Sequence, residues 1–261
     1  MKDIKNIKLF LLDMDGTIYL GDKLFDCTLP FLNLLKEQGK RFLFLTNNSS
    51  KNRDVYVKKL AKMGIDVTPD DVFTSGEATT IYLNKLKLCA RIYLVGTPAL
   101  EDEFRNAGFI LTDENPDYAV LGFDTTLTYE KLWKLCDFVR DGVPYIATHP
   151  DFNCPTETGF MPDIGSFIAC VRASTGRDPD VVVGKPNRII ADSVIEKYGV
   201  KREELCMVGD RLYTDIALGA QADIATVLVW TGESTPEDLA KTDVEPTFIF
   251  DDLGGISDAI R

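Results

Sequence analysis

The sequence has a single histidine, His149, and its six cysteines include no C-x-x-C pair. Structural zinc sites combine several closely spaced cysteine and histidine ligands, so a zinc site is not expected. Scattered cysteines in a chain of this size are instead predicted to be free thiols in or near the hydrophobic core.

The sequence also lacks a hydrophobic run near the ~20 residues that a membrane-spanning helix needs. The short apolar run at residues 9–12 is followed at once by Asp13 and Asp15, which a secretory signal would not allow. We therefore expect a cytoplasmic protein with no membrane partner.

Basic residues are the minority among the charges, with 29 Lys and Arg against 41 Asp and Glu, and the net charge is −12. Such a surface argues against nucleic-acid binding, which depends on a basic face. It does not exclude a small anionic ligand, because a metal ion and a few local cations can reverse the field inside one pocket.

Apolar runs alternate with amphipathic ones along the whole chain. The runs at residues 8–15, 41–48, 204–210 and 225–230 suit strands that are buried on both faces of a parallel sheet. Helical patterns lie between them and end at Gly39 and Gly199, as helix C-termini often do. This alternation predicts an α/β fold: a Rossmann-like three-layer core with a parallel sheet and right-handed crossovers.

The middle of the chain contains a second α/β series. Strands are predicted within residues 91–97, 116–123 and 144–150, and helices within 98–108 and 128–142. These strands do not end in carboxylate clusters. We interpret residues 78–179 as an α/β domain inserted into a core of 1–77 and 180–261, with junctions near 75–77 and 176–180. Phe123, Trp133 and Trp230 are predicted to be packing residues.

Polar residues follow the strands of the first series at their carboxyl ends, where open α/β sheets bind ligands. Asp13 and Asp15 follow the first strand, residues 46–48 follow the second, and Asp210 follows a later one. Gly16 allows the chain to turn after the first strand, so that both early carboxylates can approach one ligand. Paired carboxylates repel each other, and a divalent cation would hold them together and neutralise a phosphate.

These motifs resemble those of the haloacid dehalogenase-like hydrolase superfamily. Asp13-Met14-Asp15-Gly16-Thr17 resembles the first motif, residues 46–50 the second, Lys185 within 184–187 the third, and Gly209–Asp215 the fourth. The large insertion between the second and third motifs is similar to that of the NagD-like or para-nitrophenylphosphatase-like phosphatases, which carry an α/β cap domain. The resemblance covers essentially the whole chain.

The resemblance implies a role for each matching residue. Asp13 would be the nucleophile that forms an aspartyl-phosphate. Asp15 would be the general acid and then the base, and its carbonyl would bind Mg²⁺ with Asp13 and Asp210, supported by Asp215. The residues expected to bind substrate are Thr46, Asn47, Asn48, Lys185 and Asn187. Thr46 and Asp215 could alternatively be helix caps, and Lys185 a surface lysine.

The resemblance therefore implies a Mg²⁺-dependent phosphatase of small phosphorylated metabolites, such as sugar phosphates or nucleotides, and a homodimer formed through the cap. Asp15 favours a phosphatase over a dehalogenase, because halide leaves without a proton. The alternative is a phospho-accepting signalling or binding module without turnover, which would leave the inserted domain unexplained.

The Pro- and Gly-rich segment 148–166 is predicted to be a loop of the inserted domain that determines substrate specificity. His149 stands in this segment where the resemblance leads us to expect Asn. We interpret it as a loop residue or a polar residue near the substrate rather than a catalytic base, because Asp15 already fills that role.

Overall fold

The computed structural model describes residues 2–156 and 158–261, and the chain divides into two compact units. Unit 1 contains residues 1–46, 53–73 and 185–261, whereas unit 2 contains residues 47–52 and 74–184. Within the predicted loop 148–166, Glu157 lies outside the described residues. The boundaries predicted from the sequence, at 77/78 and 179/180, differ from this division. The prediction assigned residues 47–52 to the core, whereas the structure groups them with unit 2.

Unit 1 is built on a six-stranded sheet whose strands are β1 (Leu9–Leu12), β4 (Arg41–Thr46), β5 (Val72–Thr74), β13 (Leu205–Gly209), β14 (Ala225–Val229) and β15 (Phe248–Phe250). Their order is β15-β14-β13-β1-β4-β5, and β1 pairs in parallel with both β4 and β13. The chain extends the sheet in one direction from β1 to β5 and in the other from β13 to β15. The switch point of this topology therefore lies between β1 and β13.

Helices cover both faces of this sheet. On one face, a core that includes Phe10, Phe44 and Val227 packs against α1 (Thr28–Glu37), α2 (Arg53–Lys62) and α10 (Leu253–Ile260). Leu228 points to the opposite face, where it packs on the π-helix Leu212–Ile216. Next to this π-helix are α7 (Arg188–Tyr198) and α8 (Ala217–Ala222), which pack against each other.

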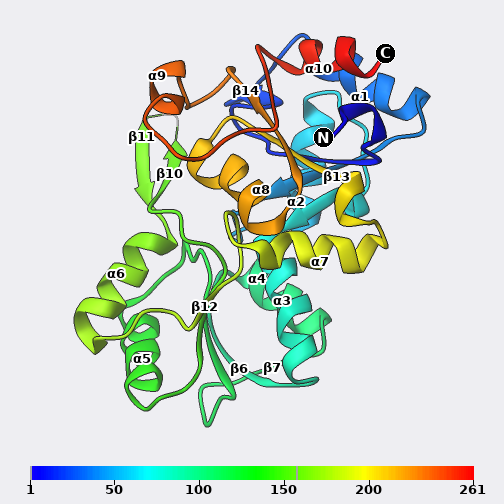
Figure 1. Ribbon diagram of the computed structural model, residues 1–261. Helices are drawn as coiled ribbons and strands as arrows, with labels where there is room; N and C mark the ends of the chain where they lie inside the picture. The colour runs from blue at the N-terminus through cyan, green and yellow to red at the C-terminus, as the bar shows by residue number, and fades with distance from the viewer. Residues whose placement is uncertain (1, 157) are drawn as a thin grey trace. The chain divides into compact units, whose positions relative to one another are not determined.

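Unit 2 contains a five-stranded sheet of β6 (Arg91–Val95), β7 (Ile110–Leu111), β8 (Tyr118–Leu121), β9 (Tyr145–Ala147) and β12 (Val181–Val182). The order is β12-β9-β8-β6-β7, and every pairing is parallel. One face packs against α5 (Tyr129–Arg140) and α6 (Ile164–Thr175). Figure 1 shows α3 (Ser75–Leu86) and α4 (Pro98–Asn106) on the other side of this sheet.

The remaining elements are short. They are the 3₁₀-helices Ile4–Asn6, Pro69–Asp71 and Arg202–Glu204, the helix α9 (Pro236–Leu239), the hairpin of β2 (Tyr19–Leu20) and β3 (Lys23–Leu24), and the hairpin of β10 (Asn153–Thr156) and β11 (Gly159–Pro162). Among the described residues, no helix is long and apolar enough to span a membrane.

The predicted α/β class is confirmed, and each strand and helix that the sequence analysis placed by its hydrophobic pattern is present. The predicted junction near residues 75–77 lies in the first turn of α3, where the Thr74 hydroxyl accepts a hydrogen bond from Glu77 N–H and caps the helix. Gly76 is small for packing reasons, since a Cβ there would lie 2.7 Å from Leu100.

One local prediction was wrong, because the segment 148–166 is not a loop throughout. It contains the antiparallel hairpin β10–β11, and its last residues begin α6, whose N-cap is Asp163. Pro155 and Pro162 occur in a two-stranded ribbon, where a strand can accept proline on its unpaired edge. The proline-rich composition of this segment therefore did not predict β10 and β11.

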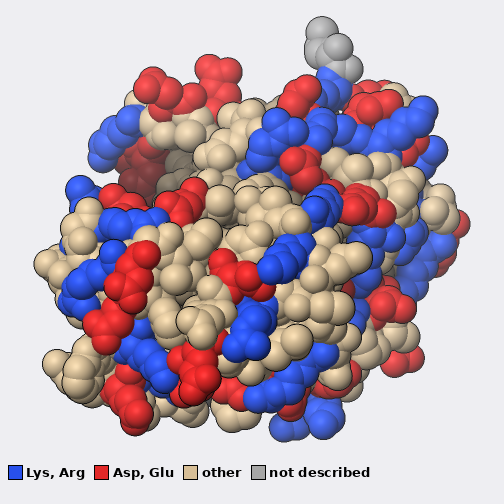
Figure 2. Space-filling model, turned by 90° about the horizontal axis from the view of Figure 1, so that it is seen from below, with Lys and Arg blue, Asp and Glu red and all other residues tan. Residues whose placement is uncertain are grey.

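The surface charges are mixed in sign. Figure 2 shows a face on which basic and acidic side chains are interspersed. The acidic excess of the sequence is therefore not gathered into one patch on this face.

Candidate active site

Two carboxylates meet at the switch point of the unit 1 sheet. Asp13 follows β1 directly and Asp210 follows β13 directly, and these neighbouring strands are in parallel register, with Leu12 opposite Val208. The N–H of Asp13 donates to Val208 O at 2.9 Å, so the pairing continues to the carboxylate itself. The strand ends therefore place Asp13 and Asp210 side by side.

A lysine and a third carboxylate complete the cluster. Asp215 belongs to the π-helix Leu212–Ile216, and carboxylate oxygens of Asp13, Asp210 and Asp215 all lie within 4.8 Å of one another. The ammonium of Lys185 donates to Asp13 Oδ1 at 2.5 Å and to Asp215 Oδ1 at 2.7 Å. Lys185 is only 3% exposed, so it is not a surface lysine.

Backbone and hydroxyl groups hold Asp210 in place. Its Oδ2 accepts from the N–H of Glu233 at 2.7 Å, and its Oδ1 accepts from the Thr17 hydroxyl at 3.3 Å. Gly16 has φ +85°, as the predicted turn requires, and a Cβ there would lie 2.6 Å from Asp210 Oδ2. Gly232 lies against the same oxygen and also has no room for a Cβ.

Both carboxylate oxygens of Asp215 accept hydrogen bonds. Its Oδ2 accepts from Arg211 N–H at 3.2 Å, while its Oδ1 is held by Lys185. Gly209 packs directly against the Asp215 side chain and leaves no space for a Cβ. Because Asp215 is completely buried and bound on both oxygens, it does more than cap a helix.

Burial and mutual repulsion disfavour the charged forms of these acids when no cation is present. Burial raises the pKa of Asp210 to about 6, and the negative charge of Asp13 adds to this effect. Burial likewise raises the pKa of Asp215 to about 7, although Lys185 opposes the shift. Burial alone would lower the pKa of Lys185, but its contacts with Asp13 and Asp215 raise it above the usual value.

The donor set fits a divalent cation that prefers oxygen. Three carboxylates converge without cysteine or histidine, and such hard ligands suit Mg²⁺, Ca²⁺ or Mn²⁺ better than zinc. The glycines at positions 16 and 232 keep the surroundings of Asp210 free of side-chain bulk. A bound cation would offset the repulsion between these carboxylates and would stabilise their charged forms.

Asp15 is set apart from the three clustered carboxylates. Burial raises its pKa, with a further contribution from Asp13, while Lys59 and the backbone N–H of Gly21 oppose the shift. Lys59 comes from α2, and its ammonium lies 4.1 Å from the centre of the Tyr19 ring. A carboxyl group with a raised pKa can hold a proton and donate it, which is the property of a general acid.

The residues of the second motif lie at the boundary of the units. Thr46 is the buried last residue of β4 in unit 1, whereas Asn47 and Asn48 belong to unit 2. The Asn47 amide donates to both oxygens of Asp151 at 3.2 Å, and Asn48 Oδ1 accepts from Ser50 N–H at 2.9 Å. These contacts engage both side chains, so the backbone N–H of Asn47 is the better candidate for a phosphate donor.

Asn187 and His149 lie away from the carboxylate cluster in the sequence, and each has its own local setting. Asn187 is the N-cap residue of α7. His149 is completely buried, and Asp163 Oδ1 lies 3.0 Å from its Nε2. The imidazole is therefore part of the interior of unit 2 rather than of an exposed loop.

Sequence reasoning missed Thr17, Arg211 and Glu233. Thr17 stands inside the first motif, and Arg211 directly follows Asp210 and feels the negative charge of Asp13, which raises its pKa. Glu233 follows β14, so the rule that polar residues after sheet strands line the ligand site could have identified it. The guanidinium Nε of Arg211 lies 2.9 Å from Glu233 Oε2.

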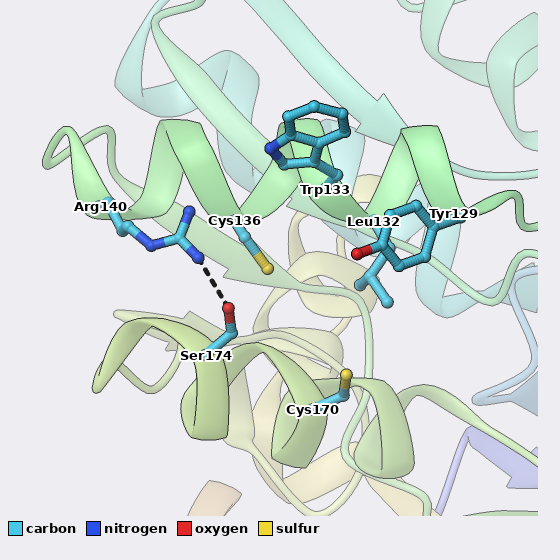
Figure 3. Close-up of a pocket in the computed structure, with 7 residues that line it drawn as sticks. All are labelled: Tyr129, Leu132, Trp133, Cys136, Arg140, Cys170 and Ser174. Atoms are coloured by element: carbon cyan, nitrogen blue, oxygen red, sulfur yellow. Dashed lines mark hydrogen bonds between the residues drawn. The ribbon is translucent and has the colours of Figure 1, made fainter.

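Unit 2 has a pocket of about 350 Å³ between α5 and α6, and Figure 3 shows the residues that line it. Cys136 and Cys170 point into the space between the helices, and Arg140 donates to Ser174 Oγ at 2.7 Å. Trp133 is 60% exposed at this pocket, so the prediction that it is a packing residue was wrong. None of the clustered carboxylates lines it, and it offers no group for phosphoryl transfer.

Comparison with known proteins identifies the family of the chain. The family of haloacid dehalogenase-like hydrolases matches residues 10–110, and a second HAD-hydrolase-like family matches residues 182–256. An acid sugar phosphatase of Staphylococcus aureus is 39% identical over 251 residues, which is 96% of each chain. The chain belongs to the haloacid dehalogenase-like hydrolases.

Solved structures narrow the family. A 4-nitrophenylphosphatase from Thermotoga maritima is 52% identical, with a TM-score of 0.95 over 99% of each chain. A p-nitrophenyl phosphatase from Archaeoglobus fulgidus is 31% identical, with a TM-score of 0.90 over 97% of this chain and 99% of its own. Within the superfamily, this protein is one of the NagD-like and para-nitrophenylphosphatase-like enzymes, a phosphomonoester hydrolase.

Proposed function

We propose that this protein is a Mg²⁺-dependent phosphatase of small phosphomonoesters that works through an aspartyl-phosphate on Asp13. The observation that carries the proposal is the contact of one buried ammonium, Lys185, with both Asp13 and Asp215. A carboxylate that must attack a phosphate dianion needs nearby positive charge, and this contact supplies it.

Asp13, Asp210 and the backbone carbonyl of Asp15 would hold the ion, with Asp215 supporting it. When bound, Mg²⁺ supplies positive charge that neutralises the phosphoryl oxygens. The remaining charge comes from Lys185, which already bridges the nucleophile and Asp215. The raised pKa values of Asp210 and Asp215 support this assignment, because a site built for a cation is strained without one.

In the first half-reaction, a carboxylate oxygen of Asp13 attacks phosphorus and the bond from phosphorus to the leaving alcohol breaks. Asp15 donates its proton to the departing oxygen, and the phosphoryl group remains as a mixed anhydride on Asp13. The raised pKa of Asp15 supports this role, because the acid must be protonated at the moment of attack.

In the second half-reaction, Asp15 is ionised and takes a proton from water as the water oxygen attacks phosphorus. The bond from phosphorus to Asp13 then breaks, which frees inorganic phosphate and restores the nucleophile. One residue thus returns to its starting protonation state after each cycle. This turnover distinguishes a phosphatase from a phospho-accepting module, and the phosphatase names of the relatives support the former.

We assign phosphate binding to the Thr46 hydroxyl, the N–H of Asn47 and Lys185, with Asn48 and Asn187 as further substrate contacts. Hydrogen-bond donors around the transferring oxygens stabilise charge in the transition state. The name of the Staphylococcus aureus relative makes sugar phosphates the first substrates to test, and nucleotides the second.

Phosphate release from para-nitrophenyl phosphate and a panel of sugar phosphates and nucleotides tests the proposal. Each assay is run with Mg²⁺ and with EDTA, on the wild type and on Asp13→Asn, which keeps the shape of the nucleophile but not its charge. We expect chelation to abolish activity and Asp13→Asn to lower kcat by about a thousandfold or more. Activity that survives Asp13→Asn would show that another group is the nucleophile.

A further inference from the structure

A continuous chain of hydrogen bonds runs through the interior of unit 2 and passes through His149. The N–H of Phe123 donates to Ser49 Oγ at 2.9 Å, and Ser49 Oγ lies 2.9 Å from Thr148 Oγ1. Thr148 Oγ1 lies 3.2 Å from His149 Nδ1, and His149 Nε2 lies 3.0 Å from Asp163 Oδ1. We call this sequence of contacts the His149 chain.

The direction of every bond in the His149 chain follows from its two ends. Ser49 Oγ accepts from Phe123 N–H, and it donates to Thr148 Oγ1 because the single hydrogen of the Thr148 hydroxyl goes to the acceptor Nδ1 of His149. The Thr148 hydroxyl can then donate to His149 Nδ1. At the other end, the Asp163 carboxylate accepts from Ile164 N–H at 2.7 Å, and it accepts the Nε2 hydrogen of His149 as well. Asp163 thus fixes the tautomer in which Nδ1 is the acceptor.

The His149 chain passes through the segment that follows Thr46. Ser49 is itself one member of that segment, and the carbonyl of Asn47 accepts a hydrogen bond from Ser75, whose hydroxyl lies 3.4 Å from His149 Nδ1. A Cβ at Gly184 would lie 2.7 Å from both Asn47 Oδ1 and His149 Cβ, so Gly184 packs closely against both residues. His149 is therefore linked to Ser49 through the Thr148 hydroxyl, and both His149 and Asn47 lie against Gly184, the residue that precedes Lys185.

The same histidine could be interpreted as a metal ligand, since atoms of His149, Asp151 and Asp163 lie within 4.8 Å of one another. The contacts favour a different role. Nε2 of His149 is satisfied by Asp163, which also caps α6. Both oxygens of Asp151 accept from the Asn47 amide. A cation bound by these three residues would have to displace the bonds of Asp163 and Asp151.

We propose that His149 is a positioning residue, which through its Nδ1 and the hydroxyls of Thr148 and Ser49 holds residues 47–50, and with them the Asn47 N–H that the proposed function assigns to phosphate binding. This inference rests on the proposed phosphatase function, because it concerns a donor of the same site. Small displacements of such a donor are costly, since a shift of about 1 Å can lower the rate by about a hundredfold. The bond from Nε2 to Asp163 serves only to orient the ring.

Two substitutions of His149 separate its two bonds. In His149→Asn, the amide oxygen takes nearly the place of Nδ1, so the acceptor for Thr148 is kept and the bond to Asp163 is lost. In His149→Gln, the amide nitrogen can reach the place of Nε2, so the bond to Asp163 is kept and the acceptor is lost. Thr148→Val breaks the same link as His149→Gln without changing the imidazole, and it remains informative if His149→Gln does not fold.

The measurements are kcat and KM with para-nitrophenyl phosphate, the inhibition constant of inorganic phosphate, and Tm, all on the full chain with Mg²⁺. Tyr93→Phe is the matched control, because it removes a buried hydroxyl of unit 2 that donates to Lys131 O at 2.9 Å, outside the His149 chain. We expect His149→Gln and Thr148→Val to lower kcat/KM by about tenfold and to weaken phosphate inhibition. A variant with both substitutions should lose no more kcat/KM than either single variant, because both substitutions break the same hydrogen bond.

His149→Asn and Tyr93→Phe should keep kcat/KM within about twofold of the wild type, whatever their Tm. Equal losses in His149→Asn and His149→Gln would overturn the assignment to Nδ1. Unchanged kinetics in His149→Gln and Thr148→Val, with a lower Tm alone, would show a purely structural residue. A wild type without activity on any phosphoester would instead overturn the proposed function, and this inference with it.

Discussion

The ammonium of Lys185 lies 2.5 Å from Asp13 Oδ1 and is almost completely buried. The same ammonium contacts Asp215, so one positive charge compensates two carboxylates in an interior where charge is costly. Residues 13, 185 and 215 come from distant parts of the chain, and this contact joins three of the four sequence motifs.

Replacing Lys185 by methionine should therefore lower stability as well as activity. The variant leaves Asp13 and Asp215 buried without their partner, a situation that typically costs about 3–5 kcal/mol. We expect the free energy of unfolding to fall by that order in EDTA and kcat to fall by about a hundredfold or more. Urea unfolding and phosphate release measure the two effects.

Lys134→Met is the control for this prediction. Lys134 pairs with Asp113 at 2.8 Å on the exposed surface, where an ion pair contributes little. This variant should keep full activity and change stability by about 0.5 kcal/mol or less. A Lys185→Met variant as stable as Lys134→Met would mean that the buried contact does not compensate the carboxylates.

Asp15→Asn should separate the two half-reactions according to the leaving group. Para-nitrophenolate leaves without a proton, so the first half-reaction should survive with para-nitrophenyl phosphate. The second needs Asp15 as base and should be slow. Rapid-quench measurement should show a burst of about one nitrophenolate per enzyme, followed by slow turnover.

Sugar phosphates should show no such burst with Asp15→Asn, because an alkoxide needs the proton that the variant cannot give. Their hydrolysis should fall further than that of para-nitrophenyl phosphate. Equal losses for both classes of substrate would argue that Asp15 is not the general acid.

The stability of the metal-free protein should fall as pH rises from about 4 to about 7. Burial raises the pKa of Asp210 to about 6 and that of Asp215 to about 7, above their values in the unfolded chain. The folded protein then binds more protons than the unfolded one across this interval, which favours folding at the lower pH. Added Mg²⁺ requires the ionised acids, so the Tm increase that it causes should grow over the same interval.

Thermal unfolding at several pH values, with Mg²⁺ and with EDTA, measures this behaviour. Asp210→Asn should reduce both the pH dependence without metal and the Tm increase with metal. A Mg²⁺ effect that is independent of pH would contradict the assignment of these carboxylates to the cation.

Gly232→Ala should lower activity far more than stability. A Cβ at this position would overlap Asp210 Oδ2, so the carboxylate must shift away from its place beside Asp13. We expect kcat to fall by about tenfold or more, and the concentration of Mg²⁺ needed for half-maximal activity to rise. Steady-state assays across a Mg²⁺ titration measure both.

Gly39→Ala is the control for this prediction, because it should lower stability and not activity. Gly39 has φ +67° and no atom near its Cβ position, so alanine there costs about 1–2 kcal/mol of backbone strain but disturbs no active-site group. It should lower Tm and leave kcat unchanged. Should Gly232→Ala behave like Gly39→Ala, the packing of Gly232 on Asp210 would have no role in the reaction.

Much of unit 1 could be predicted because its signals are local. The run at residues 9–12 is continuous and apolar because β1 is buried on both faces, and Asp13 follows it because the strand ends there. Gly199 marks the end of α7 because only a residue that tolerates a positive φ fits that position. Such patterns depend on neighbours in the sequence, so the sequence alone determined the α/β class and the strand ends.

Only the tertiary structure decided which of these residues meet. The contacts of Lys185 with Asp13, and of Glu233 N–H with Asp210, join segments far apart in the chain, and no local pattern encodes their distance. The polar and proline-rich neighbours of His149 suggested a loop residue, yet the tertiary structure buries His149 completely and brings its Nε2 to Asp163. Local composition determines whether a residue can form a strand or a turn, whereas the packing of distant segments determines what its side chain touches.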